Sequence, residues 1–135
     1  MAVNAALSLQ KALRDRLLAH APLIALLGGP AVHDHAPQAG PLPCVVFAET
    51  ETRDFGTQTL AGHEHLVTLH VWSTAEGVKQ VQAIIAEIDA ALSGAALTLS
   101  AHRLVNLHVA LWSAARADGT RRRGMIRLRA VTEPL

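Results

Sequence analysis

Eight histidines are the residues of this 135-residue chain with the clearest capacity for chemistry. His33 and His35 are separated by one residue, and so are His63 and His65. In an extended chain, side chains two residues apart lie on the same face, and paired imidazoles of this kind are able to bind a metal ion. A closed site needs three or four convergent ligands, however, and nothing in the sequence indicates that the two pairs meet. We expect surface or partner-facing histidines, with no metal and no cofactor.

The nucleophilic side chains also lack the arrangements typical of an enzyme. Cys44, the single cysteine, follows Pro43 at the start of an apolar run, where a thiol behaves as a small apolar group. Ser73 and Ser113 lie outside any Gly-x-Ser-x-Gly motif, and the glycines at 28–29 are not followed by the Lys and Ser/Thr of a phosphate-binding loop. The sequence therefore predicts no catalytic residue. An enzyme that binds a metal through the two histidine pairs is the least favoured alternative.

Arginine is concentrated near the end of the chain, where six arginines and one acidic residue lie between positions 116 and 129. If 121–132 forms a strand, Ile126 and Leu128 face the core, and Arg127 and Arg129 face the other side of the sheet. Three interpretations stay open: a solvated charged edge, an interface with acidic groups of another subunit, or a wall close to DNA. The candidate inter-subunit or channel surface comprises Arg121, Arg122, Arg123, Arg127, Arg129, Glu49, Glu51 and Asp54.

Composition narrows the class of protein further. A net charge of +1 gives no general attraction to a polyanion, and an aromatic content of 3% leaves few platforms for base stacking, so a specific nucleic-acid ligand is disfavoured. The single cysteine fits a reducing compartment. We see neither a signal peptide nor an apolar run of membrane-spanning length, and the length suits a single domain, 1–135.

Periodicity predicts the elements that must position these side chains. Apolar residues at helical spacing indicate helices at 5–20, at 22–27 and after Ser73, where Ser73 and Glu76 have capping-box spacing, through to Leu92. Alternation predicts strands at 44–50, 63–73, 103–113 and 121–132, with an exposed loop or long hairpin tip at 52–62. In the third strand we expect one apolar face, made of Val105, Leu107, Val109 and Leu111.

The order of these elements predicts the fold class. Helix, strand, strand, helix, strand, strand favours an α+β fold with a four-stranded, mostly antiparallel sheet and two main helices packed on one face.

Several short phrases, taken in order, carry a resemblance that covers nearly the whole chain. They are Val32-His-Asp-His-Ala-Pro37, Leu42-Pro-Cys-Val-Val46, Leu69-His-Val-Trp-Ser73 leading into Glu76-Gly77, Asp118-Gly119 and Arg123-Gly-Met-Ile-Arg-Leu-Arg-Ala130. In this combination the chain resembles the phage tail completion or tail terminator family, small neck proteins of long-tailed phages and gene transfer agents.

The resemblance implies a structural role in a virion or phage-like particle, with assembly in the host cytoplasm. Members of the family close the tail tube as a homo-oligomeric ring, commonly a hexamer, and join the tail to the head connector, and DNA passes through the ring. A head-closure or adaptor neck protein is the nearest alternative. The family has no catalytic residues to carry over. The candidate tube-contact loop holds Arg53, Asp54, Phe55 and Gln58.

Overall fold

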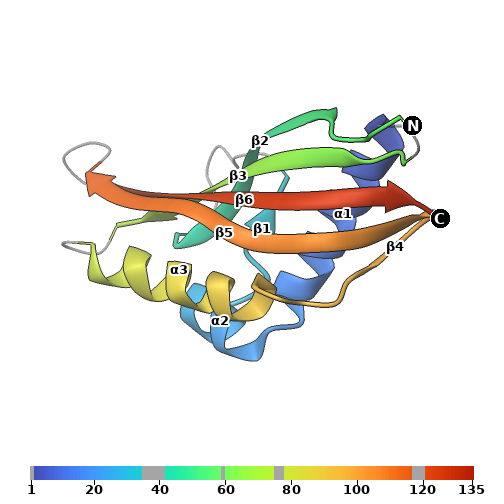
Figure 1. The fold of residues 1–135 in the computed structure, drawn as a ribbon. Coiled ribbons are helices and arrows are strands. Elements are labelled where there is room, and N and C mark those ends of the chain that lie inside the picture. The colour runs from blue at the N-terminus through green and yellow to red at the C-terminus, as the bar shows by residue number, and fades with distance from the viewer. Residues whose placement is uncertain (1, 35–41, 59, 75–77, 117–120) are drawn as a thin grey trace.

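The computed structural model describes residues 2–34, 42–58, 60–74, 78–116 and 121–135. The described residues form three helices and six strands (Figure 1). The helices are α1 (Ala2–Leu18), α2 (Ala21–Leu27) and α3 (Lys79–Leu92). The strands are β1 (Val32–His33), β2 (Cys44–Asp54), β3 (His63–Ser73), β4 (Thr98–Leu99), β5 (His102–Arg116) and β6 (Arg122–Pro134). The predicted α+β class is confirmed.

The strands form one mixed sheet in the order β1-β2-β3-β6-β5-β4. Only β1 and β2 pair in parallel, so the sheet is mostly antiparallel, as predicted. The prediction of four strands is wrong, because β1 and β4 add a two-residue strand at each margin. Two residues are too few to produce an alternating pattern, so the sequence carries no sign of them.

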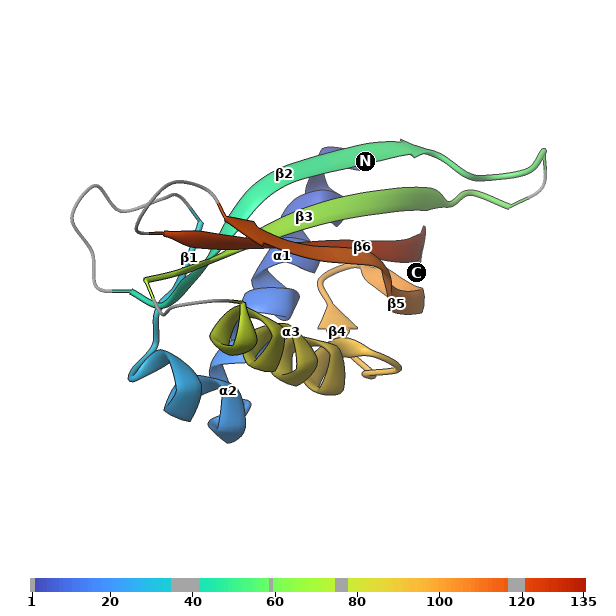
Figure 2. The same cartoon turned by 90° about the vertical axis from the view of Figure 1, so that its left-hand side faces the viewer.

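All three helices pack on one face of the sheet, as predicted (Figures 1 and 2). On β3 the alternate residues Val67, Leu69 and Val71 point into the core, and on β6 Ile126 and Leu128 do so. The helices supply the facing stripe, which includes Leu9, Leu13, Leu17, Ile84 and Ile88, all fully buried. The core is therefore aliphatic.

Gly124 lets α3 approach β6 closely. A Cβ atom at Gly124 would lie 2.5 Å from Val81 Cγ1 and 3.0 Å from Ile85 Cδ1, both on α3. Separations this short are repulsive, so the space beside β6 is already filled by the helix. A residue without a side chain is required here by packing.

Two bulges change the face of β5, and they overturn one prediction about this strand. The register against β6 shifts between Leu104 and Asn106 and again between Val109 and Leu111. Each extra residue moves the following side chains to the opposite face. Leu107 is therefore buried, whereas Val105 and Leu111 are 55% and 50% exposed. The expected single apolar face of this strand does not exist.

The elements that precede and follow β3 have boundaries that differ from those predicted. The strand before β3 continues to Asp54, beyond the predicted end at 50, so of the two alternatives for 52–62 the structure has the long hairpin tip, which projects beyond the other strands (Figure 2). After β3, α3 begins at Lys79 with Val78 as its N-cap and no side-chain capping bond. Ser73 is the last residue of β3, and its hydroxyl donates to Gln80 Oε1. Its predicted capping partner, Glu76, lies outside the described residues.

The packing at Gly124 leads to a first prediction. Gly124→Ala should lower the free energy of unfolding by about 1–3 kcal/mol, because the added methyl group overlaps Val81 and Ile85. Urea denaturation of the purified protein measures this. Ala115→Ser, an exposed site on the neighbouring strand, should change the stability by less than about 0.5 kcal/mol. Equal stability of Gly124→Ala and the unmodified protein would show that α3 is not held against β6 as described.

Candidate functional site: the open sheet face and the β2–β3 hairpin

The face of the sheet opposite the helices carries several of the charged side chains that the sequence analysis selected. We call it the open face and define it by the side chains that the register places there near the hairpin: Glu49, Glu51 and Arg53 of β2, Glu64, Leu66 and Thr68 of β3, and Arg127 and Arg129 of β6. Glutamates on β2 and arginines on β6 form two stripes, separated by β3. The face is therefore striped with opposite charges.

The structure brings together only part of the predicted charged surface. Asp54 pairs with His63 across β2 and β3, and Arg122 pairs with Ser73 across β3 and β6. Because side chains alternate between the two faces of a strand, both Asp54 and Arg122 lie on the helix side of the sheet. Arg121 and Arg123 lie over the Trp72 ring, with guanidinium carbons 5.3 and 6.0 Å from its centroid, at the other end of β6. Whether the predicted set serves as an inter-subunit or channel surface stays a prediction.

Glu64 is a buried carboxylate held between two arginines. Its side chain is only 5% exposed, Arg53 Nε donates to Oε1 at 2.5 Å, and Arg129 Nε donates to Oε2 at 2.6 Å. The hydrogen bonds from Arg129 and then Arg53 lower the pKa of Glu64, so the carboxylate stays ionised. The sequence analysis missed this trio, since its members are 11 and 65 residues apart and only the register between strands brings them together.

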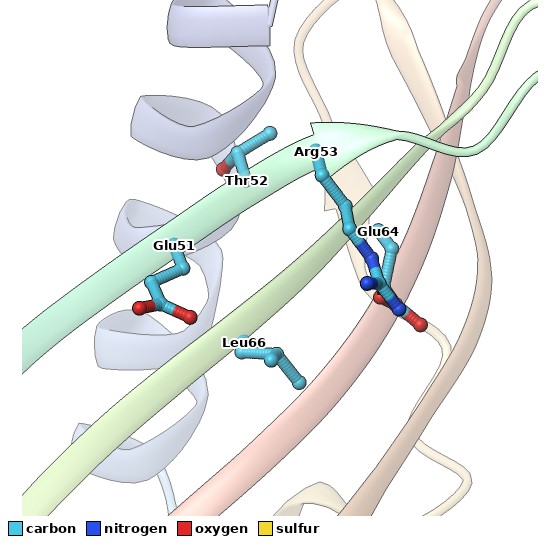
Figure 3. Close-up of a pocket in the computed structure, with 5 residues that line it drawn as sticks. All are labelled: Glu51, Thr52, Arg53, Glu64 and Leu66. Atoms are coloured by element: carbon cyan, nitrogen blue, oxygen red, sulfur yellow. The ribbon is translucent and has the colours of Figure 1, made fainter.

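A hollow of about 410 Å³ lies on the open face beside this ion-pair network. Its lining is Glu51, Thr52, Arg53, Glu64 and Leu66 (Figure 3). In the close-up, the Arg53 and Glu64 side chains meet at one side of the hollow, and Glu51 approaches it from β2. With one free carboxylate, one paired carboxylate and one apolar floor residue, the hollow suits contact with a protein surface better than the binding of an anion.

The same network fixes the base of the hairpin. The Arg129 guanidinium carbon lies 5.3 Å from the centre of the Phe55 ring, an arrangement for a cation–π contact. Within the tip, the Gly56 N–H donates to Asp54 Oδ1 at 2.9 Å, and the Thr57 N–H donates to the Leu60 carbonyl at 2.7 Å. The hairpin is therefore tied to β6 at its base and closed by its own hydrogen bonds at its tip.

Apolar side chains are exposed at the hairpin tip. Phe55 and Leu60 are 50% and 66% exposed. The predicted tube-contact residues Arg53, Phe55 and Gln58 are also exposed, as is Asp54 at the strand end. Exposed apolar groups on a projecting, hydrogen-bonded hairpin are typical of a protein-binding surface. Leu60 was not among the predicted contacts, although an apolar residue in a polar loop was a signal for it.

The histidines do not assemble a metal site in the part of the chain that is described. His33 pairs with Val46 and His63 with Asp54, near opposite ends of β2, and His35 lies outside the described residues. No group of three or more potential metal ligands occurs among the described side chains. Cys44 is buried, and this burial raises the pKa of its thiol, which disfavours the reactive thiolate.

His65 is a fully buried histidine with two hydroxyl partners. Its Nδ1 is 2.9 Å from Thr52 Oγ1, and its Nε2 is 2.8 Å from Thr132 Oγ1. Burial, with smaller contributions from His63 and His102, lowers the pKa of His65 to about 4. The imidazole is therefore neutral at physiological pH, and it links β2, β3 and β6 near the base of the hairpin.

The charged open face and the exposed apolar side chains of the hairpin tip are typical of the class of proteins that contact other proteins through exposed surfaces. No helix in the described residues has the length and apolarity needed to cross a membrane.

Comparisons with known proteins agree on one family. The model of the family called tail completion protein gp17 matches residues 11–133. A chain in the solved structure titled "Virion of native gene transfer agent (GTA) particle" superposes with a TM-score of 0.86 at 36% sequence identity, and the match covers 96% of this chain and 97% of that one. No curated protein matches the sequence. The chain belongs to the tail completion protein gp17 family, and it is a structural protein of the tail or neck of a phage-like particle.

Burial of neutral His65 predicts a loss of stability in weak acid. Its pKa is about 4 in the folded protein and close to 6.5 in the unfolded chain, so the unfolded chain binds the proton first as the pH falls. Stability should therefore be full above pH 6.5 and decrease between pH 6.5 and 4, by at most about 3 kcal/mol. Urea denaturation at pH 7.5, 6 and 5 measures this change in the free energy of unfolding. His65→Gln should flatten this dependence, whereas His108→Gln, at an exposed site, should retain it. An unchanged slope in His65→Gln would assign the acid sensitivity elsewhere.

The ion pairs of Glu64 with Arg53 and Arg129 predict that the charge of this carboxylate holds the hairpin in place. Glu64→Gln keeps the size of the side chain but removes the charge that Arg53 and Arg129 share. We expect faster amide hydrogen exchange and faster proteolysis at 53–62, with little change in α3. Glu51→Gln, an exposed carboxylate in the same strand pair, is the matched control and should leave exchange at the tip unchanged. If both variants behave alike, the network does not hold the hairpin.

Proposed function

We propose that this protein ends the growth of a phage-like tail: a ring of copies, six in number, caps the tail tube and joins it to the head connector. The observation that carries the proposal is the match, over nearly the whole chain, to a protein that is part of a gene transfer agent virion. The name of the family, tail completion, supports the same step of assembly. On this proposal the protein has no catalytic role.

Two separate surfaces support the idea of a junction between different proteins. The hairpin projects from the body of the protein (Figure 2), and its tip contains the exposed apolar residues Phe55 and Leu60. The open face presents charged stripes and lies along the body of the sheet. We assign the tip to the contact with the tail tube protein and the sheet to contacts between copies or to the channel wall.

The charge pattern of the open face suits a channel through which DNA passes. A uniformly basic wall would bind phosphates and slow the DNA, because each neutralised phosphate releases counterions. Here Glu49 and Glu51 lie two strands from Arg127 and Arg129, which limits the attraction of the arginines for a polyanion. The surface therefore fits DNA passage without sequence-specific binding.

Tail length in particles made without this gene tests the proposal. Electron microscopy should show overlong tails or tails detached from heads, and a plasmid copy of the gene should restore the parental particles. Rescue by a Phe55→Ser, Leu60→Ser double variant should fail, because the tube contact loses its apolar side chains. Rescue by Val105→Ser, an equally exposed apolar site on β5, should succeed.

Two other outcomes would change the assignment. Tails of normal length on heads that leak or stay empty would place the protein at head closure, the adaptor role. Particles normal in every respect would contradict an assembly role at this junction.

A further inference from the structure

Both margins of the sheet present long strand edges that no described strand covers. β1 pairs with β2 only at Val45 and Val46, and β4 pairs with β5 only at His102 and Arg103. Beyond these positions, the outer edges of β2 and β5 have no strand partner among the described residues. Unpaired edges of this length are positions at which another strand adds through backbone hydrogen bonds.

The two edges match in direction and regularity. Within the sheet β2 and β6 run one way, and β3 and β5 run the other. A second copy placed beside β5 in the same orientation therefore brings its β2 antiparallel to β5, the geometry of a regular ladder. The bulge in β2 ends at Glu49 and the last bulge in β5 ends at Leu111, which leaves regular runs at 49–54 and 111–116.

The side chains along these runs are complementary. β5 contains no acidic residue from His102 to Arg116, and it carries the small residues Ser113, Ala114 and Ala115 where a neighbouring backbone must approach. The exposed run of β2 carries Glu49 and Glu51 on the open face, and its one arginine is already paired with Glu64. In a joined sheet the arginine stripe of each copy would lie between its own glutamates and those of the next copy.

A groove beside the β5 edge accounts for an exposed tryptophan. Trp112, which is 50% exposed, lines a hollow of about 540 Å³ between β5 and α3, together with Val109, Ile85 and three further α3 residues. A strand added to β5 would place its helix-side residues, Thr50 and Thr52 of the next copy, over this groove. The methyl groups of these threonines would then cover apolar surface that one copy alone leaves in water.

We propose that β5 of one copy binds β2 of the next copy as an added antiparallel strand, so that one sheet continues from copy to copy. The contact uses two different surfaces of the chain, which is the type of interface that closes into a ring by rotation. This inference rests on the proposed function for the ring and adds the surfaces from which the ring is built.

Disulfide trapping in assembled particles tests the contact. In a Cys44→Ala background, Ser113→Cys is combined with Glu49→Cys or Glu51→Cys, which cover two registers on the same face. Oxidation should give a ladder of covalent oligomers on a non-reducing gel in at least one pair, and reductant should collapse it. Each single cysteine, and Ser113→Cys with Lys11→Cys on the exposed side of α1, should give no ladder. Absence of a ladder in both registers, in particles with normal tails, would overturn the edge contact and leave tail termination intact.

Hydrogen exchange of the unmodified protein gives a test that does not depend on new cysteines. Amides of 111–116 and 49–54 should exchange at least tenfold more slowly in assembled particles than in the isolated chain. Unchanged exchange at both edges would overturn the proposal. If particles made without the gene have normal tails, tail termination is overturned. A ladder and protected edges in particles that contain the protein would still support the contact, so the two proposals fail separately.

Discussion

The structure depends on one constraint: the helices cover a single face of the sheet. The long strands must then place apolar residues on the helix side near their centres, as β3 does with Val67, Leu69 and Val71 and β6 does with Ile126 and Leu128. The close approach of α3 at Gly124 fixes the covered side. Most charged residues of these strands lie on the open face for the same reason, and Asp54 and Arg122 lie on the helix side only at strand ends.

The pairing of charges on the open face follows from the burial of one carboxylate, that of Glu64. Glu64 loses most of its hydration, and a buried charge is tolerated only with close partners. Arg53 and Arg129 supply both partners, and Arg129 also contacts Phe55. These two arginines are thus committed within the chain. Glu49, Glu51 and Arg127 are the exposed charged residues of the open face outside this network, a smaller set than the arginine content of the sequence predicted.

Sequence patterns predicted the elements whose residues interact locally. The strand at 63–73 was predicted with its observed bounds, because its alternation is uninterrupted, and the apolar stripe from Val78 to Leu92 identified the second long helix. The bulges in β5 were not predictable, since one extra residue leaves no mark in composition but reverses the faces of Val105 and Leu111. The Arg53–Glu64–Arg129 network also escaped prediction, because it depends on the register of three strands.

The charges on the two edge strands, β2 and β5, determine which edges of two copies can pair without repulsion. A two-fold pair of β2 edges would place Glu49 and Glu51 of one copy beside the same residues of the other, and like charges across neighbouring strands are destabilising. A pair of β5 edges would leave both β2 edges exposed and would end assembly at two copies. Joining β2 to β5 avoids the repulsion and leaves one edge of each kind free at every step. Acidic residues on a single edge thus disfavour a two-fold pairing of β2 edges, and in the proposed ring only closure would satisfy the last pair of edges.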